Sequence, residues 1–295
     1  MLNKRLQFIG FDKALKICSI LIFFILSGCP HNTIQHRTPL TFSKTLSESV
    51  TTDYREYGGF SIWINCNERL AKATYTYIEA DKDSYNRSQT KNYYLDNRFN
   101  TNCNQLSSKT YQKTLGDSRK LPPHKHFDVG HLVNKNHLDY SQRYIDESMV
   151  MGNMHPQVRL FNQRKGAWYY TEKLVECLRQ ISPLHVWAGV IIGNSDADDY
   201  FVNSHGVKTP SYSWKLIHRT DINKIQIFVM PNSHTSIAEN IDSYVIGYAD
   251  FVLMLEDSFV RELVSRYEKI SADINTWVVE GHNTLMCEGI VTSIK

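Results

Sequence analysis

Several short stretches of the chain alternate between apolar and polar residues, as strands with one buried face do. Residues 59–80 alternate over two segments that are separated near Asn67 and Glu68, so they predict two strands joined by a turn. Three later apolar runs have strand length and are bounded by Gly, Pro or Asn: residues 186–192, 213–217 and 225–230. These runs predict buried strands of one sheet.

Two longer segments have the spacing of helices. Residues 160–181 carry Trp168, Val175 and Leu178 close to a helical period, and residues 243–270 are rich in Leu, Val, Glu and Arg. Residues 81–120 are polar and predict loops with short strands. The pattern therefore predicts an α+β fold, in which helices flank a central, mostly antiparallel sheet.

The first 28 residues have the composition of an export signal. Four basic residues precede an apolar run at residues 17–26, which is too short for a permanent membrane span. The run ends in Leu-Ser-Gly-Cys, which resembles a lipobox with Cys29 as the lipidated residue. A plain signal peptide or a short anchor that contains a cysteine is the alternative. Pro30 stands where aspartate would favour retention in the inner membrane, so the outer membrane is favoured.

These features divide the chain into three parts. Residues 1–28 are the predicted signal peptide, and residues 29–58, which are rich in Ser and Thr, are a predicted flexible tether. Residues 59–295 form one predicted domain with a helical extension at the C-terminus. We expect a periplasmic or cell-envelope protein that is attached to the membrane through a lipid on Cys29.

The net charge gives no argument for a nucleic-acid partner. The chain carries a formal net charge of +3, but the signal holds four of its 33 basic residues and one of its 30 acidic residues. The remainder is therefore balanced, with 29 of each kind. Any surface for nucleic acid must be local.

Four cysteines remain when the signal and Cys29 are set aside. In an exported chain without a Cys-x-x-Cys pair, four cysteines favour two disulfides over a zinc site. Three connectivities are possible, and we favour Cys66 with Cys103 and Cys177 with Cys287.

Three motif stretches follow one another with regular spacing. The first reads His-Phe-Asp-Val-Gly-His and ends at His131, and the second reads Asn-Met-His-Pro-Gln from Asn153 and continues to Asn162, Trp168 and Glu172. The third combines Ala-Gly-Val-Ile, Trp-Lys and Met-Pro-Asn at residues 188–191, 214–215 and 230–232. Each stretch alone is typical of a turn or a buried core, but their order and spacing together are distinctive.

Together these motifs resemble those of the DNA/RNA non-specific endonucleases, a family of ββα-metal nucleases with an Asp-Arg-Gly-His motif. The resemblance covers roughly residues 59–255. It implies that His131 is the general base, because a neutral imidazole can take a proton from water near neutral pH. It further implies that Asp128 orients the ring or shapes the turn, and that Asn153 positions groups near the base.

The resemblance also implies a cofactor and substrates. Asn162 would hold a hard divalent cation, normally Mg²⁺, with Mn²⁺ or another divalent ion as the alternative. Glu172 would reach this cation through a water molecule, and the substrates would be DNA and RNA. Arg159, Arg164 and Lys165 follow the second motif and are candidate phosphate contacts.

The chain departs from the family pattern in two places. Val129 replaces the motif arginine, so a cation near the phosphate is missing from this position. The step from Asn162 to Trp168 is two residues longer than in the family. In a regular helix, two extra residues would rotate Glu172 about the helix axis by about 200° relative to Asn162. We therefore predict an irregular backbone at residues 163–166.

Two alternative functions stay open at this point. His124, His126 and His131 could form a zinc site, because histidine is a common zinc ligand. The loss of the motif arginine could instead leave a catalytically impaired lipoprotein that only binds nucleic acid.

Overall fold

A computed structural model describes residues 38–42, 51–80, 85, 90–111, 125–193, 200–275 and 277. The predicted signal peptide, Cys29 and Cys287 lie outside these residues. No helix within the described part of the chain is both long and apolar enough to cross a membrane.

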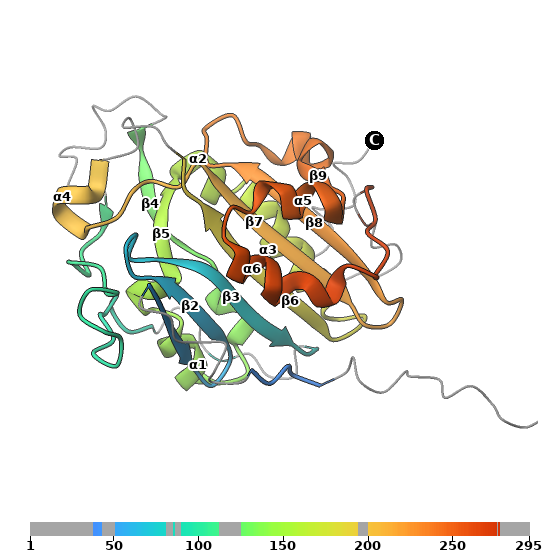
Figure 1. Cartoon of the computed structure of the whole chain (residues 1–295). Helices are drawn as coiled ribbons and strands as arrows, with labels where there is room; N and C mark the ends of the chain where they lie inside the picture. The colour runs from blue at the N-terminus through green and yellow to red at the C-terminus, as the bar shows by residue number, and fades with distance from the viewer. Residues whose placement is uncertain are drawn as a thin grey trace, which may run out of the picture. The chain divides into compact units, whose positions relative to one another are not determined.

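The main structural element is a sheet of seven strands in which every neighbouring pair is antiparallel (Figure 1). Its strands, in spatial order, are β1 (Thr52–Glu56), β2 (Ser61–Asn65), β3 (Leu70–Ile78), β6 (Leu184–Ile191), β7 (Tyr212–Arg219), β8 (Lys224–Pro231) and β9 (Val245–Ile246). The predicted strands within residues 59–80 and the three later apolar runs all belong to this sheet. The expected α+β class with a central antiparallel sheet is therefore confirmed.

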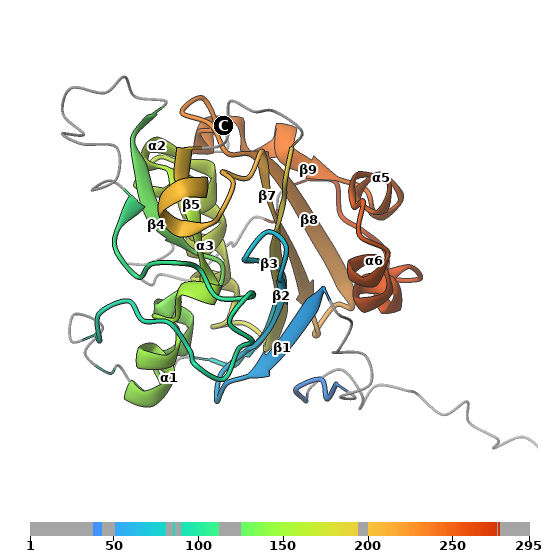
Figure 2. The same ribbon diagram turned by 60° about the vertical axis from the view of Figure 1, so that its left-hand side comes forward.

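Both faces of the sheet are buried. Side chains along each strand point alternately to opposite faces, so one strand contributes residues to two cores. On β8, Ile225, Ile227 and Val229 join one core cluster, whereas Phe228 and Met230 join the other. Helices α5 (Tyr248–Met254) and α6 (Ser258–Val264) cover the first cluster, and α3 (Ala167–Leu178) covers the second. Figure 2 shows α5 and α6 on one side of the sheet and α3 on the other.

The remaining helices are short. They are α1 (Gln142–Glu147), α2 (Arg159–Asn162) and α4 (Val202–His205), together with 3-10 helices at Lys135–Leu138, Met151–Asn153, Ala238–Tyr244 and Ser265–Tyr267. The helix predicted over residues 160–181 is thus divided into α2 and α3. The helical segment predicted over residues 243–270 consists mainly of α5 and α6, which are separated at residues 255–257.

The sheet begins earlier than the sequence indicated. Strand β1 lies within residues 29–58, which we expected to be a tether, and it pairs with β2 along its whole length. Upstream of it, the ring of Phe42 packs edge-on against Trp63 and Trp187, with centroids 4.9 and 5.6 Å away. Contacts of the folded domain therefore extend upstream of residue 59.

A disulfide joins the end of β2 to the loop that follows residue 95. It links Cys66 to Cys103, as predicted. Two residues further on, Gln105 Nε2 donates to the carbonyl oxygens of Met151 and Met154, at 3.0 Å each. The crosslinked loop thus supports the start of strand β5 (Met154–Val158). Cys177 is also disulfide-bonded, and its pairing with Cys287 stays a prediction.

Candidate functional site

The first two motif stretches form a two-stranded antiparallel ribbon. Strand β4 (Phe127–His131) pairs with β5 so that Asp128 faces Gln157 and His131 faces Met154. Gly130 is required at the centre of β4, because a Cβ atom there would lie 1.9 Å from Gln157 Oε1. The side chain of Gln157 in the second motif therefore occupies the space that the absent side chain of Gly130 in the first motif leaves open.

The third motif stretch fixes this ribbon to the main sheet. Asn232, just beyond β8, accepts a hydrogen bond from the Val158 amide and donates to the Pro156 carbonyl, both at 2.9 Å. His155 Nε2 lies 3.1 Å from Ser213 Oγ on β7. The ribbon is thus held from two directions, so the residues on β4 have a rigid support.

His131 ends strand β4, and the residue as a whole is partly exposed. Its Nε2 atom is buried and has no hydrogen-bond partner among the described residues. Burial, reinforced by the charge of Lys135, lowers the pKa of His131 to about 3. The imidazole is therefore neutral at physiological pH and able to accept a proton, but a pKa this low makes it a weaker base than the near-neutral imidazole that the sequence led us to expect.

Asp128 connects the ribbon to the segment that follows it. Its carboxylate accepts hydrogen bonds from Arg159 Nε at 3.3 Å, from Asn162 Nδ2 at 3.2 Å and from Gln163 Nε2 at 2.9 Å. The sequence left open whether Asp128 orients the histidine ring or shapes the turn. These three bonds show that it anchors helix α2 to strand β4.

The bond to Asp128 also orients the side chain of Asn162. Only the amide nitrogen can donate to a carboxylate, so Asn162 Oδ1 must point away from Asp128. Asn162 is partly exposed, and its Oδ1 accepts no hydrogen bond from another described residue. An amide oxygen held in this way is a suitable ligand for a hard divalent cation.

The described residues contain no group of three or more His, Cys, Asp or Glu side chains that could hold a metal ion. His124, one member of the alternative histidine cluster, lies outside the described residues. The amide oxygen of Asn162 is a ligand type that suits Mg²⁺ better than zinc, which favours nitrogen and sulfur.

The predicted irregularity between Asn162 and Glu172 is confirmed. Gln163 is extended (ψ 176°), and Lys165 has a positive φ of 76°, so α2 ends before α3 begins at Ala167. Gly166 packs tightly in this break, because a Cβ atom there would meet the Phe161 carbonyl oxygen at 2.1 Å. The two extra residues are absorbed here, and Glu172 is not turned away from Asn162 by a continuous helix.

Glu172 lies on α3 in a buried polar cluster. Asn134 contacts its side chain, and the cation with the largest electrostatic effect on it is Lys215 on β7. Burial raises the pKa of Glu172 to about 7, although the Lys215 ammonium acts in the opposite direction.

Asn153 is fully buried and fixes the loop that follows His131. Its Oδ1 accepts from the Val133 amide at 2.9 Å, and its Nδ2 donates to the carbonyls of Val133 at 3.0 Å and Ser148 at 2.9 Å. The side chain thus acts on the backbone two residues after the histidine.

The candidate phosphate contacts differ in their surroundings. Arg159 is ion-paired with Asp128, and its side chain is 31% exposed, whereas Arg164 and Lys165 are exposed in the break between α2 and α3. Val129 is partly buried against the core. Of these three basic residues, Arg159 is the one with a recorded contact to the ribbon, through Asp128.

Two residues of the site were not predicted from the sequence, and a third, Lys215, was quoted only as part of the third motif stretch, without a role. Lys135 acts on His131 through its charge, Tyr93 lies with its ring centroid 6.4 Å from that of His131, and Lys215 influences Glu172. The position of Lys135, four residues after His131, was a usable signal. Tyr93 lies far from the motif in sequence, and nothing local pointed to it.

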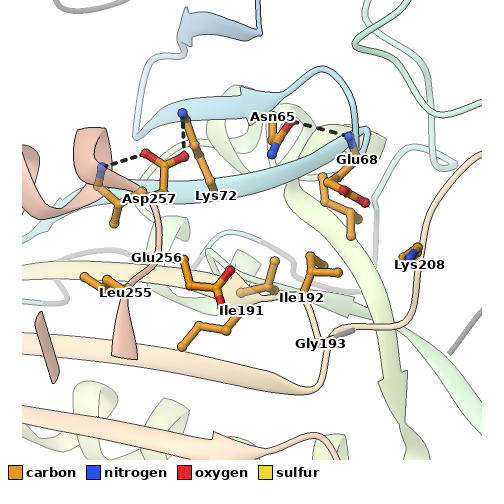
Figure 3. Close-up of a pocket in the computed structure, with 13 residues that line it drawn as sticks. Asn65, Glu68, Lys72, Ile191, Ile192, Gly193, Lys208, Leu255, Glu256 and Asp257 are labelled. Atoms are coloured by element: carbon orange, nitrogen blue, oxygen red, sulfur yellow. Dashed lines mark hydrogen bonds and ion pairs between the residues drawn. The ribbon is translucent and has the colours of Figure 1, made fainter. Parts of the chain in front are cut away.

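A surface pocket of about 230 Å³ lies elsewhere on the fold (Figure 3). It is lined by residues of β2, β3 and β6 and of the connection between α5 and α6, and a Lys72–Asp257 ion pair of 2.9 Å lies at its wall. None of the predicted catalytic or metal-binding residues lines it. The candidate site is therefore the ribbon and the first turns of α2 and α3.

Comparisons with known proteins identify the family and the fold of the chain. The family model described as DNA/RNA non-specific endonuclease matches residues 37–251. One solved chain, titled "Crystal structure of the EndoG/EndoGI complex: Mechanism of EndoG inhibition", matches with a TM-score of 0.52 and 19% identity, covering 68% of this chain and 82% of that chain. This likeness shows a shared fold. No curated protein sequence matches.

Proposed function

Because this chain belongs to the DNA/RNA non-specific endonuclease family, we propose that it cleaves DNA and RNA with little sequence specificity, using His131 as the general base. The expected ββα-metal nuclease fold and the assignment as a phosphodiester hydrolase follow from its family. The observation that supports the choice of base is the position of His131 at the end of β4, the strand whose Asp128 bonds directly to the proposed metal ligand Asn162.

In the proposed reaction, His131 takes a proton from a water molecule as the water oxygen attacks phosphorus. The bond from phosphorus to the 3′ oxygen breaks, and the proton that this oxygen needs comes from solvent. Asp128 contributes by holding α2 against β4. Asn153 contributes by fixing the backbone next to the base. Such positioning matters because proton transfer requires the base to lie within hydrogen-bond reach of the nucleophile.

Family members use a divalent cation, and we propose Mg²⁺ as the ion in this protein, with Mn²⁺ as the alternative. Asn162 Oδ1 would hold it, and the Glu172 carboxylate would add negative charge beside it. When bound, such an ion stabilises charge on the phosphate and on the departing oxygen. The oxygen-only set of candidate ligands supports a hard cation.

The proposal is tested by the cleavage of supercoiled plasmid and of RNA by the full chain in mild detergent, with Mg²⁺ or with EDTA. We expect both polymers to be cut and EDTA to stop the reaction. Binding of DNA by folded protein without any cleavage would instead support the second candidate, a catalytically impaired nucleic-acid-binding protein. The observation that favours this second candidate is Val129 in place of the motif arginine.

Substitution of Asn162 by alanine is expected to weaken Mg²⁺ binding, because it removes the proposed amide ligand. We expect the Mg²⁺ concentration for half-maximal cleavage to rise at least about tenfold, in line with the loss of one designed contact at a metal site. Gln163→Ala is the matched control, since Gln163 donates to the same carboxylate oxygen of Asp128. Equal effects of the two variants would assign Asn162 to anchoring alone.

Restoring the motif cation is expected to accelerate cleavage. A transition-state contact of this kind is typically worth about a hundredfold in rate, so Val129→Arg should raise kcat/KM by about ten- to a hundredfold. Val129→Met is the control, because methionine has comparable reach without charge. If the two variants cleave at the same rate, Arg159, Arg164, Lys165 or Lys135 already supplies the required positive charge.

We further propose that the protein is exported and attached to the outer membrane through a lipid on Cys29. The basic start, the short apolar run and the Leu-Ser-Gly-Cys sequence support this placement. Cys29→Ser should release the protein from the membrane fraction and abolish incorporation of labelled fatty acid. Unchanged membrane attachment in this variant would indicate an uncleaved anchor.

A further inference from the structure

Tyr93 is an aromatic residue beside the proposed base that the reaction described above does not yet use. Its ring centroid lies 6.4 Å from that of His131, with an angle of 53° between the ring planes. It also lies within electrostatic range of Asp128, whose carboxylate holds Asn162. All four of these residues are partly exposed, so the tyrosine stands at an edge of the site that solvent reaches.

The backbone next to Tyr93 is fixed to the segment that precedes strand β5. The amide of Tyr94 donates to the Met149 carbonyl at 3.3 Å, and the Tyr94 carbonyl accepts from the Met151 amide at 2.8 Å. The Tyr93 side chain itself packs against the core cluster that α3 covers. The tertiary fold therefore holds the ring beside His131, and a substrate that reaches this histidine meets a preorganised side chain.

The hydroxyl group of Tyr93 makes no hydrogen bond to any described residue. Two tyrosines near it differ in this respect: Tyr94 donates to the Glu147 carbonyl at 3.3 Å, and Tyr111 donates to Gln105 Oε1 at 2.9 Å. Burial, reinforced by the charge of Asp128, raises the pKa of Tyr93, so its hydroxyl keeps the proton at physiological pH. Tyr93 therefore offers a donor for which the described part of the protein supplies no acceptor.

A phosphodiester is an acceptor that suits this donor. Its two non-bridging oxygens share a negative charge and accept hydrogen bonds strongly, and tyrosine hydroxyls are regular donors to nucleic-acid phosphates. We propose that the Tyr93 hydroxyl donates a hydrogen bond to a non-bridging oxygen of the phosphate that lies at His131. This inference rests on the proposed function, because it takes the substrate to be DNA or RNA. The contact supplies, without a charge, part of the phosphate binding that is lost with Val129 in place of the motif arginine.

Tyr93→Phe tests this contact, because it removes the hydroxyl and keeps the ring beside His131. We expect the Kd for a fluorescein-labelled oligothymidylate in EDTA to rise about tenfold, the usual result of losing a hydrogen bond to a charged group. The kcat/KM for cleavage of DNA and of RNA should fall by at least as much. Tyr94→Phe is the matched control, since its hydroxyl bonds to the Glu147 carbonyl, and it should leave both values nearly unchanged.

A phosphorothioate linkage gives a readout that a change in packing alone would not move. Replacing one non-bridging oxygen by sulfur weakens the hydrogen bond that this position accepts. The substrate is an oligonucleotide with one phosphorothioate of defined stereochemistry, and the measured quantity is the ratio of cleavage rates at the unmodified and the modified bond. For one of the two stereoisomers, this ratio should fall in Tyr93→Phe and stay at the wild-type value in Tyr94→Phe.

The outcomes separate the two proposals. A wild-type protein that binds the oligonucleotide without cleaving it would reject the proposed function, while the Kd values of Tyr93→Phe and Tyr94→Phe would still decide the inference. The inference is overturned if the wild type does not bind the oligonucleotide, if Tyr93→Phe binds it as tightly as the wild type, or if Tyr94→Phe weakens binding equally. Wild-type ratios for both phosphorothioate stereoisomers in Tyr93→Phe would overturn it as well.

Discussion

His131→Ala is expected to reduce the cleavage of both DNA and RNA by about 10²- to 10⁴-fold, the usual contribution of a general base. The variant should remain folded, because the buried Nε2 has no hydrogen bond to a described residue to lose. The measurement is the rate of plasmid nicking at saturating Mg²⁺, together with the thermal unfolding midpoint. Because burial lowers the pKa of His131 to about 3, its protonation should not limit the rate above about pH 4. Any loss of activity nearer neutral pH should come from Glu172.

His126→Ala is the matched control for this experiment. His126 precedes β4 by one residue and is a histidine of the alternative zinc cluster, but it has no role in the proposed reaction. Its replacement should leave the cleavage rate nearly unchanged. Equal losses in the two variants, with zinc bound by the purified wild type, would contradict His131 as a base and restore the zinc alternative.

Asp139→Asn is expected to destabilise the protein by about 3 kcal/mol, because it leaves the buried Arg179 with a single carboxylate partner, Glu176 at 3.8 Å, instead of two. Asp139 and Arg179 are both fully buried, with Arg179 Nη1 3.2 Å from Asp139 Oδ1. Arg179 also donates to the carbonyl oxygens of Glu79 and Asn136. This pair ties the end of α3 to the segment that follows His131. The free energy of unfolding in urea measures the effect.

A second arginine–aspartate pair gives the control. Arg219 and Asp221 form a 2.6 Å contact whose side chains are 14% and 29% exposed. Because exposed ion pairs contribute about 0–1 kcal/mol, Asp221→Asn should change the free energy of unfolding by no more than that. If the two substitutions have equal effects, the buried pair does not hold the two segments together as inferred.

The main sheet could be predicted because its strands either alternate between apolar and polar residues or form short apolar runs, and both patterns can be recognised in a single sequence. The β4–β5 ribbon could not be predicted in this way. Strand β5 is buried at every position although it contains His155 and Gln157, and Pro156 in its centre argues against a strand. The pairing of β5 with β4 depends on Asn232, which is distant in sequence, and on Gly130, which has no side chain and so adds nothing to a hydrophobic pattern.

The site was predictable to the extent that its residues follow one another closely in sequence. Asp128 and Asn162 are 34 residues apart, yet the motif order indicated one site, and a direct hydrogen bond joins them. The break at residues 163–166 was predictable as well, because two additional residues in a helix have a fixed geometric consequence. Lys215 and Tyr93 come from distant strands and loops, so only the tertiary fold brings them near Glu172 and His131.

The Cys66–Cys103 crosslink gives the protein a dependence on its redox surroundings. It closes a loop with a sequence separation of 37 residues, and a crosslink over such a loop typically stabilises a fold by about 3–4 kcal/mol. The loop also supports Met154 through Gln105, so reduction loosens the strand that backs His131. A newly made chain in a reducing cytoplasm lacks this support. Under the export proposed above, the protein would therefore gain this support only after it leaves the cytoplasm, away from the chromosome of the cell that makes it.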